Sequence, residues 1–120
     1  MQINLRNNQL GTLETDAFYD LPSLVKLDLR NNDLCQIGNI LSALTHEDLV
    51  VDLAENRIKY LVEAQYKPYI ETRKNKGYIN LGGNSFSCQC DMKWLLATNF
   101  HWNDLLINGT CADGRSMDQV

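Results

Sequence analysis

One pattern of apolar and polar positions occurs four times along the chain. Each copy reads apolar-x-apolar-x-x-Asn-x-apolar, and successive copies are 24, 24 and 28 residues apart. The copies begin at Ile3, Leu27, Val51 and Ile79. Two apolar residues separated by one polar residue are typical of a short strand that buries a single face. The pattern therefore predicts short strands near residues 3–5, 27–29, 51–53 and 79–81.

An asparagine occupies the sixth position of every copy. One short strand cannot bury its apolar face alone, so we expect the copies to stack into a parallel sheet over a continuous core. Where the chain turns away from the sheet, backbone N–H and C=O groups lose their ladder partners. Surface turns are an alternative place for asparagine, but an amide that both donates and accepts can bond those backbone groups in a buried ladder. The predicted ladder residues, which are also expected to bond each other, are Asn8, Asn32, Asn56 and Asn84.

The segments between the predicted strands return the chain to the start of the next copy. Apolar residues at helical spacing between Ile37 and Leu44 predict one or two helical turns there. The third segment is longer and has apolar anchors between Leu61 and Ile70, followed by the basic stretch 73–76, which we interpret as an exposed loop.

The four copies resemble the leucine-rich repeat, which has a period of about 20 to 29 residues. The sequence that follows, N-x-F-x-C-x-C over 84–90 with Trp94-Leu95 and Cys111 downstream, resembles the cysteine-rich C-terminal flanking cap of extracellular leucine-rich-repeat proteins. The resemblance implies an α/β fold, a right-handed β-α solenoid of short parallel strands. Its repeats would occupy residues 1–86, and an incomplete cysteine-rich cap would occupy 87–120.

The same resemblance assigns roles to the cysteines. It implies a disulfide between Cys88 and Cys111 and leaves Cys90 without a partner, because no fourth cap cysteine follows. We therefore expect the chain to be a fragment that lacks the far end of the cap and earlier repeats. Cys35 is expected to be free and packed as a small apolar residue. The alternative is a zinc site built from the three cap cysteines and His101, although a C-x-C gap is tighter than zinc ligands usually have.

Charge and composition argue against some classes of function. The formal net charge of −4 argues against a general nucleic-acid binder. No apolar run approaches the roughly 20 residues of a membrane span, so we expect no membrane contact by this segment. The triplet from Asn108 to Thr110 is an N-glycosylation acceptor, and together with the implied disulfide it favours an oxidising, extracellular route.

Catalytic motifs are missing from the sequence. His46-Glu47-Asp48 has no second histidine at zincin spacing, and there is no G-x-S-x-G nucleophile motif. We therefore expect a protein that is not an enzyme and that holds no cofactor and no metal.

The polar residues between the core positions would line the concave face of the sheet. Adjacent strands are about 4.8 Å apart, so equivalent residues in successive copies are neighbours. This makes the concave face the candidate site for a protein ligand, with Tyr78 and the arginines as anchors. The resemblance implies a secreted or cell-surface protein of the receptor, adhesion or innate-immune type, and an intracellular leucine-rich-repeat scaffold with reduced cysteines is the alternative. The candidate face residues are Lys26, Asp28, Arg30, Asp52, Tyr78 and Asn80.

Overall fold

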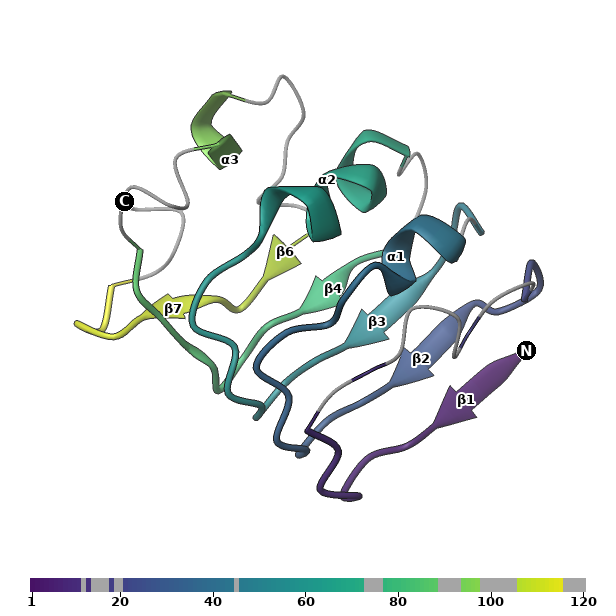
Figure 1. Cartoon of the computed structure of the whole chain (residues 1–120), viewed down its shortest axis with the longest axis horizontal. Helices are drawn as coiled ribbons and strands as arrows, with labels where there is room; N and C mark the ends of the chain where they lie inside the picture. Colours follow the sequence, from purple (N-terminus) through teal and green to yellow (C-terminus); the bar gives the residue numbers. More distant parts are fainter. Residues whose placement is uncertain are drawn as a thin grey trace.

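The central feature of the computed structural model is a parallel sheet of five short strands. The structure describes residues 1–11, 13, 18, 21–44, 46–72, 77–88, 94–97 and 106–115. The sheet order is β1-β2-β3-β4-β6, so neighbouring strands follow one another along the chain (Figure 1). The strands are β1 (Gln2–Asn4), β2 (Lys26–Asp28), β3 (Val50–Asp52), β4 (Ile79–Asn80) and β6 (Leu106–Ile107).

The register of the sheet follows the repeated pattern. Ile3 pairs with Leu27, Leu27 with Val51, and Val51 with Ile79, so equivalent template positions lie side by side. The first three strands begin and end one residue earlier than predicted, and the fourth ends at Asn80. The chain bends away after the strand, yet the second apolar residue still continues the ladder. The N–H of Leu29, for example, donates to the carbonyl of Asp52 at 2.9 Å.

The fifth strand, β6, was not predicted from the pattern. It pairs with β4 in parallel, with Asn80 opposite Ile107. Its sequence carries Asn108 where the template requires a second apolar residue, so the signal was lost. A separate two-stranded parallel sheet joins β5 (Ser85–Phe86) to β7 (Thr110–Cys111).

Two helices lie on the same side of the main sheet (Figure 1). The predicted helical turn is confirmed as α1 (Ile40–Ala43), and Ile37, Ile40 and Leu44 are buried. The longer helix α2 (Glu63–Thr72) was not predicted, because Pro68 lies inside it and proline normally argues against a helix interior. The basic stretch 73–76 lies outside the described residues.

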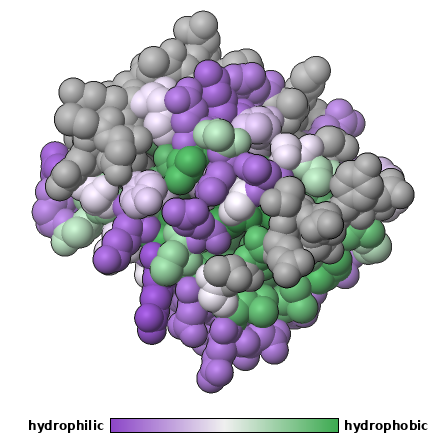
Figure 2. All heavy atoms as spheres, viewed as in Figure 1, coloured by the Kyte–Doolittle hydropathy of each residue, from purple (hydrophilic) through white to green (hydrophobic). Residues whose placement is uncertain are grey.

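The core fills the space between the sheet and the helices. Leu27 in β2 and Leu29 directly after it have no exposed surface, whereas Lys26 is exposed. At the β1 end the equivalent Ile3 and Leu5 are only half-buried. Figure 2 shows hydrophobic atoms at the surface beside hydrophilic ones, over β1 and β2. Burial is therefore most complete in the middle repeats.

The C-terminal segment contacts the segment that follows the third copy. Helix α3 (Trp94–Ala97) buries Leu95, and the Trp94 indole N–H donates to the carbonyl of Leu61 at 2.9 Å. Apolar residues at helical spacing from Met92 to Phe100 predict a longer helix here, and both of those ends lie outside the described residues.

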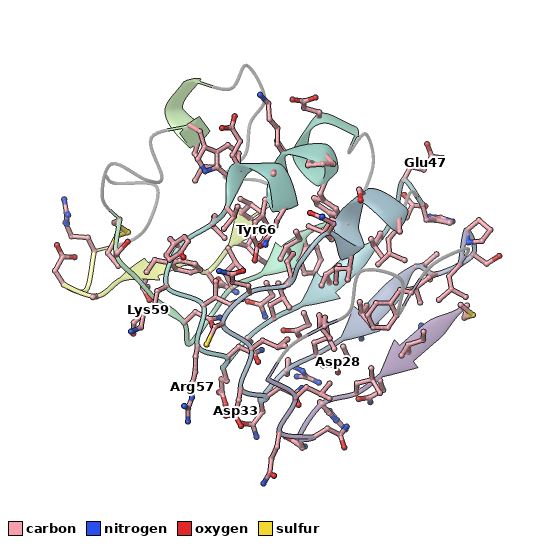
Figure 3. All side chains as sticks on the ribbon, viewed as in Figure 1. Asp28, Asp33, Glu47, Arg57, Lys59 and Tyr66 are labelled. Carbon is pink, nitrogen blue, oxygen red and sulfur yellow. A yellow bond between two sulfur atoms is a disulfide. The ribbon has the colours of Figure 1, made fainter. Side chains whose placement is uncertain are left out.

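Tyr66 on α2 carries a buried hydroxyl that has no hydrogen-bond partner among the described residues. Figure 3 shows the side chain between α2 and the sheet, and burial raises the pKa of its phenol. Tyr69, one turn further, is buried as well, but its hydroxyl donates to the carbonyl of Leu49 at 2.6 Å. The two buried tyrosines can therefore be compared directly, since the Tyr69 hydroxyl has a hydrogen-bond partner and the Tyr66 hydroxyl has none among the described residues.

We expect Tyr66→Phe to raise the free energy of unfolding by about 1 kcal/mol, because it removes a buried unpaired polar group. Tyr69→Phe should lower it by about 1 kcal/mol, because it leaves the Leu49 carbonyl without its donor. Urea titration followed by circular dichroism measures both changes. A loss of stability in Tyr66→Phe as large as that in Tyr69→Phe would show that the Tyr66 hydroxyl is satisfied in solution.

Candidate binding face

The predicted asparagine ladder is present and joins successive turns. The side-chain oxygen of Asn32 accepts the N–H groups of Asn8 and Leu10, each at 3.0 Å. Its amide nitrogen donates to the carbonyls of Leu5 and Leu29 at 3.1 and 3.0 Å. One buried amide therefore ties the turn of its own repeat to the turn of the preceding repeat.

The next two ladder residues repeat this geometry. Asn56 donates to the carbonyls of Leu29 and Leu53, both at 3.0 Å. Asn84 donates to the carbonyls of Leu53 and Leu81 at 2.9 and 3.1 Å. Both side chains are buried, as predicted. The bonds run between amide and backbone. The prediction that the ladder residues also bond each other holds in this form for Asn8, whose backbone N–H donates to the Asn32 side-chain oxygen, whereas within the described residues no hydrogen bond joins two of the side-chain amides.

Asn8 departs from the prediction because it is exposed. Its amide nitrogen donates only within its own turn, to the carbonyls of Leu5 and Arg6 at 2.8 and 3.1 Å. Asn32, Asn56 and Asn84, by contrast, each donate also to a carbonyl of the preceding copy.

A second column of polar side chains also supports the backbone. In every copy the Asn or Asp at the second template position accepts the backbone N–H two residues further on. Asp28 accepts from Arg30 at 3.2 Å, and Asp52 accepts from Ala54 at 3.1 Å. Asn4 and Asn80 do the same, at 3.2 and 3.1 Å. This local side-chain to backbone bond turns the chain out of the strand, so the column has a structural role that the sequence analysis did not assign.

Asp28 was predicted to be available to a partner, but the structure buries it. Only 4% of its surface is exposed. The Arg30 guanidinium donates to both of its carboxylate oxygens, from Nε at 3.0 Å and from Nη2 at 2.9 Å. These bonds hold the pKa of the Asp28 carboxyl below its usual range. The nearest Asp52 oxygen lies 3.4 Å from the Arg30 Nε, so Asp28 and Arg30 form the centre of an internal charge network.

The remaining candidate residues present accessible side chains. Lys26 and Tyr78 are exposed, Tyr78 by 38%, and Asp52 and Asn80 are half-buried. The register aligns Lys26 with Val50 and Asp52 with Asn80, so equivalent residues of successive copies are neighbours, as predicted. We call this surface the open face of the sheet, because α1 and α2 lie on the other side (Figure 1).

A hollow of about 320 Å³ crosses the C-terminal ends of β1 to β4 beside the open face. The first two copies each contribute an arginine to its lining, whereas the third copy contributes Ala54 and Glu55. Sequence reasoning missed the hollow, because it arises from the change from long to short side chains at one column position. The lining residues are Arg6, Asn7, Arg30, Asn31, Ala54, Glu55 and Asn80.

The cysteine assignments are tested in part. A disulfide joins Cys88 to Cys111, which are 23 positions apart in the sequence, as the family resemblance implied. Two sulfurs in a disulfide are not thiolate ligands, so the alternative zinc site loses two of its four groups. Cys90 and His101 lie outside the described residues. Cys35 is free but exposed, so the prediction that it is packed was wrong.

The glycosylation triplet lies where β6 ends. Asn108 is exposed, and its amide nitrogen donates to the Asn80 side-chain oxygen at 3.1 Å. This bond occupies one of the two amide hydrogens. None of the described helices has the length and hydropathy that a membrane crossing needs.

Comparison with known families places the similarity in the N-terminal part. Residues 1–34 match a family model described as leucine rich repeat, and residues 23–46 match a second model with the same description. These two segments contain β1, β2 and α1. A search of curated proteins found no match. The family models and the parallel sheet fit a repeat fold, and the models do not extend to the disulfide-linked segment.

Proposed function

We propose that this chain is a protein-recognition module from a solenoid of leucine-rich repeats, and that it binds its ligand on the open face of the sheet rather than catalysing a reaction. The observation that supports this most directly is that the two faces of the sheet differ. One face packs on the helices, and the strand ends are held rigid by Asn32, Asn56 and Asn84. The other presents polar and aromatic side chains on a pre-formed frame, which lowers the entropy cost of binding.

We further propose that the parent protein is extracellular, either secreted or the ectodomain of a receptor, and that residues from 87 onward form a cysteine-rich cap. The Cys88–Cys111 disulfide and the exposed Asn108 acceptor support an oxidising route. Adhesion and innate-immune recognition are the functions that such proteins have in the family it resembles.

An intracellular scaffold is the second candidate, and one observation favours it. Cys35 is exposed and free, and an unpaired exposed thiol is unusual in a secreted protein. Peptide mapping of the native full-length protein without reductant separates the two. A linked Cys88–Cys111 pair supports the extracellular proposal, and two free thiols there support the scaffold.

The binding test uses residues of the open face whose side chains form no hydrogen bond or salt bridge among the described residues. We expect Lys26→Glu and Tyr78→Ala to weaken binding about tenfold or more against a panel of secreted proteins and cell-surface ectodomains, because interface aromatic and charged anchors dominate affinity. Glu47→Lys, an exposed change outside the open face, should leave binding unchanged. Loss of binding in Glu47→Lys, with both open-face variants unaffected, would place the ligand elsewhere.

A further inference from the structure

The hollow beside the open face runs across the strands rather than along one of them. It takes one or two lining residues from each of four successive copies, beginning with Arg6 in the first and ending with Asn80 in the fourth. Three strand spacings of about 4.8 Å give it a length of about 14 Å. A ligand that fills this hollow is therefore elongated and crosses the strands at their C-terminal ends.

Charge is distributed unevenly over the surface that the hollow and the open face form together. The first two copies contribute three cations, Arg6, Lys26 and Arg30, and one carboxylate, Asp28, so their net charge is +2. On the same surface the next two copies contribute Asp52 and Glu55, giving a net charge of −2. Arg57 of the third copy is not among the lining residues and pairs with Asp33 at 3.6 Å. The surface is neutral in sum but polarised from β1 towards β4.

The two ends of this polarity are open to a ligand. Arg30 is already engaged with Asp28 and lies near Asp52. By contrast, Arg6 and Glu55 are exposed, and within the described residues neither side chain forms a salt bridge. They lie two strands apart, with Arg30 between them in the hollow.

The part of the hollow over β3 and β4 lacks the long side chains that line it over β1 and β2. The position that holds Arg6 and Arg30 in the first two copies holds Ala54 and Gly82 in the next two. A backbone segment can approach the sheet over Ala54, where an arginine would have blocked it.

We propose that the hollow binds an extended segment of a protein partner that carries an acidic and a basic residue three positions apart. The acidic side chain pairs with Arg6 and the basic side chain pairs with Glu55. Two strand spacings are about 10 Å. In an extended chain of polyproline II form, residues three positions apart lie on the same face and about 9 Å from each other. The proposal rests on the proposed function and specifies the chemistry of the partner at that same surface.

Selection from a phage-displayed library of random dodecapeptides on the immobilised, oxidised full chain tests the spacing. Peptides enriched on the unaltered protein should carry Asp or Glu three positions from Lys or Arg, in either order. Selection on Arg6→Glu should lose the acidic residue, and selection on Glu55→Lys should lose the basic one. Lys59→Glu, an exposed change outside the hollow, should leave the selected pattern intact.

A double-mutant cycle then measures the contact itself. With an enriched peptide, Arg6→Gln and replacement of the peptide's acidic residue by Gln should each weaken binding about fivefold, and the two changes together should cost little more than either alone. Additive losses would overturn the assigned contact. Enriched peptides without the charge pair, or no enrichment at all, would overturn this inference. The proposed function would fail separately, if Lys26→Glu and Tyr78→Ala left binding to a protein ligand unchanged.

Discussion

Asn56→Ala is expected to lower the free energy of unfolding by about 3 kcal/mol. The change removes the donor to the carbonyls of Leu29 and Leu53 and the acceptor for the N–H of Leu34. These backbone groups are buried, and each one left unpaired costs about 1–3 kcal/mol, although local relaxation recovers part of the sum. Equilibrium urea unfolding monitored by circular dichroism measures the difference.

Asn8→Ala is the matched control, because it makes the same substitution at the same template position. Asn8 is exposed and donates only within its own turn, so water can replace its bonds and the loss should stay below about 1 kcal/mol. Asn31 gives an intermediate reference. It is exposed, but it has φ of 55° and donates to the Asn7 side chain at 2.7 Å, and alanine tolerates that backbone conformation less well. Equal shifts in the urea midpoint for Asn56→Ala and Asn8→Ala would refute the ladder as the source of rigidity.

Removal of the disulfide by the double change Cys88→Ala and Cys111→Ala should cost about 3 kcal/mol. The bond closes a loop between residues 23 positions apart, and loss of that constraint increases the entropy of the unfolded chain. Alanine is the suitable replacement because both side chains are buried. The measurement is the urea midpoint of the oxidised protein with and without a reducing agent.

Reductant should bring the unaltered protein to the stability of the double variant and should leave the variant itself nearly unchanged. Cys35→Ser serves as the control, since that thiol is free and exposed, and it should change the free energy of unfolding by less than about 0.5 kcal/mol. If the unaltered protein were insensitive to reductant, the disulfide would not contribute to its stability.

The strands and the ladder were predictable because the physical demand recurs at one spacing. Leu27 and Leu29 face the core for the same reason that Val51 and Leu53 do, and an Asn three residues later meets the same unpaired backbone groups each time. Helix α2 was missed because it contains Pro68, and strand β6 was missed because Asn108, directly after it, interrupts the expected pattern.

The candidate binding face was predicted less well, because exposure depends on neighbours that the sequence does not place. The alternation of side chains put Asp28, Asp52 and Lys26 on one face correctly. It did not reveal that Arg30 encloses Asp28, or that the same column bonds the turning backbone. Cys35 illustrates the same limit, since its position after a core leucine indicated packing and the fold leaves it exposed.

The sequence by itself determined the repeat, its period, the residues that face the core and the asparagines that hold the turns, because these follow from periodic local chemistry. Only the tertiary structure decided which polar residues remain free to bind a partner. The hollow between Arg6 and Asn80 exists because side chains from four copies, far apart in the chain, come together at strand spacing and differ in length. Such a surface depends on the contrast between copies, whereas the fold depends on what the copies share.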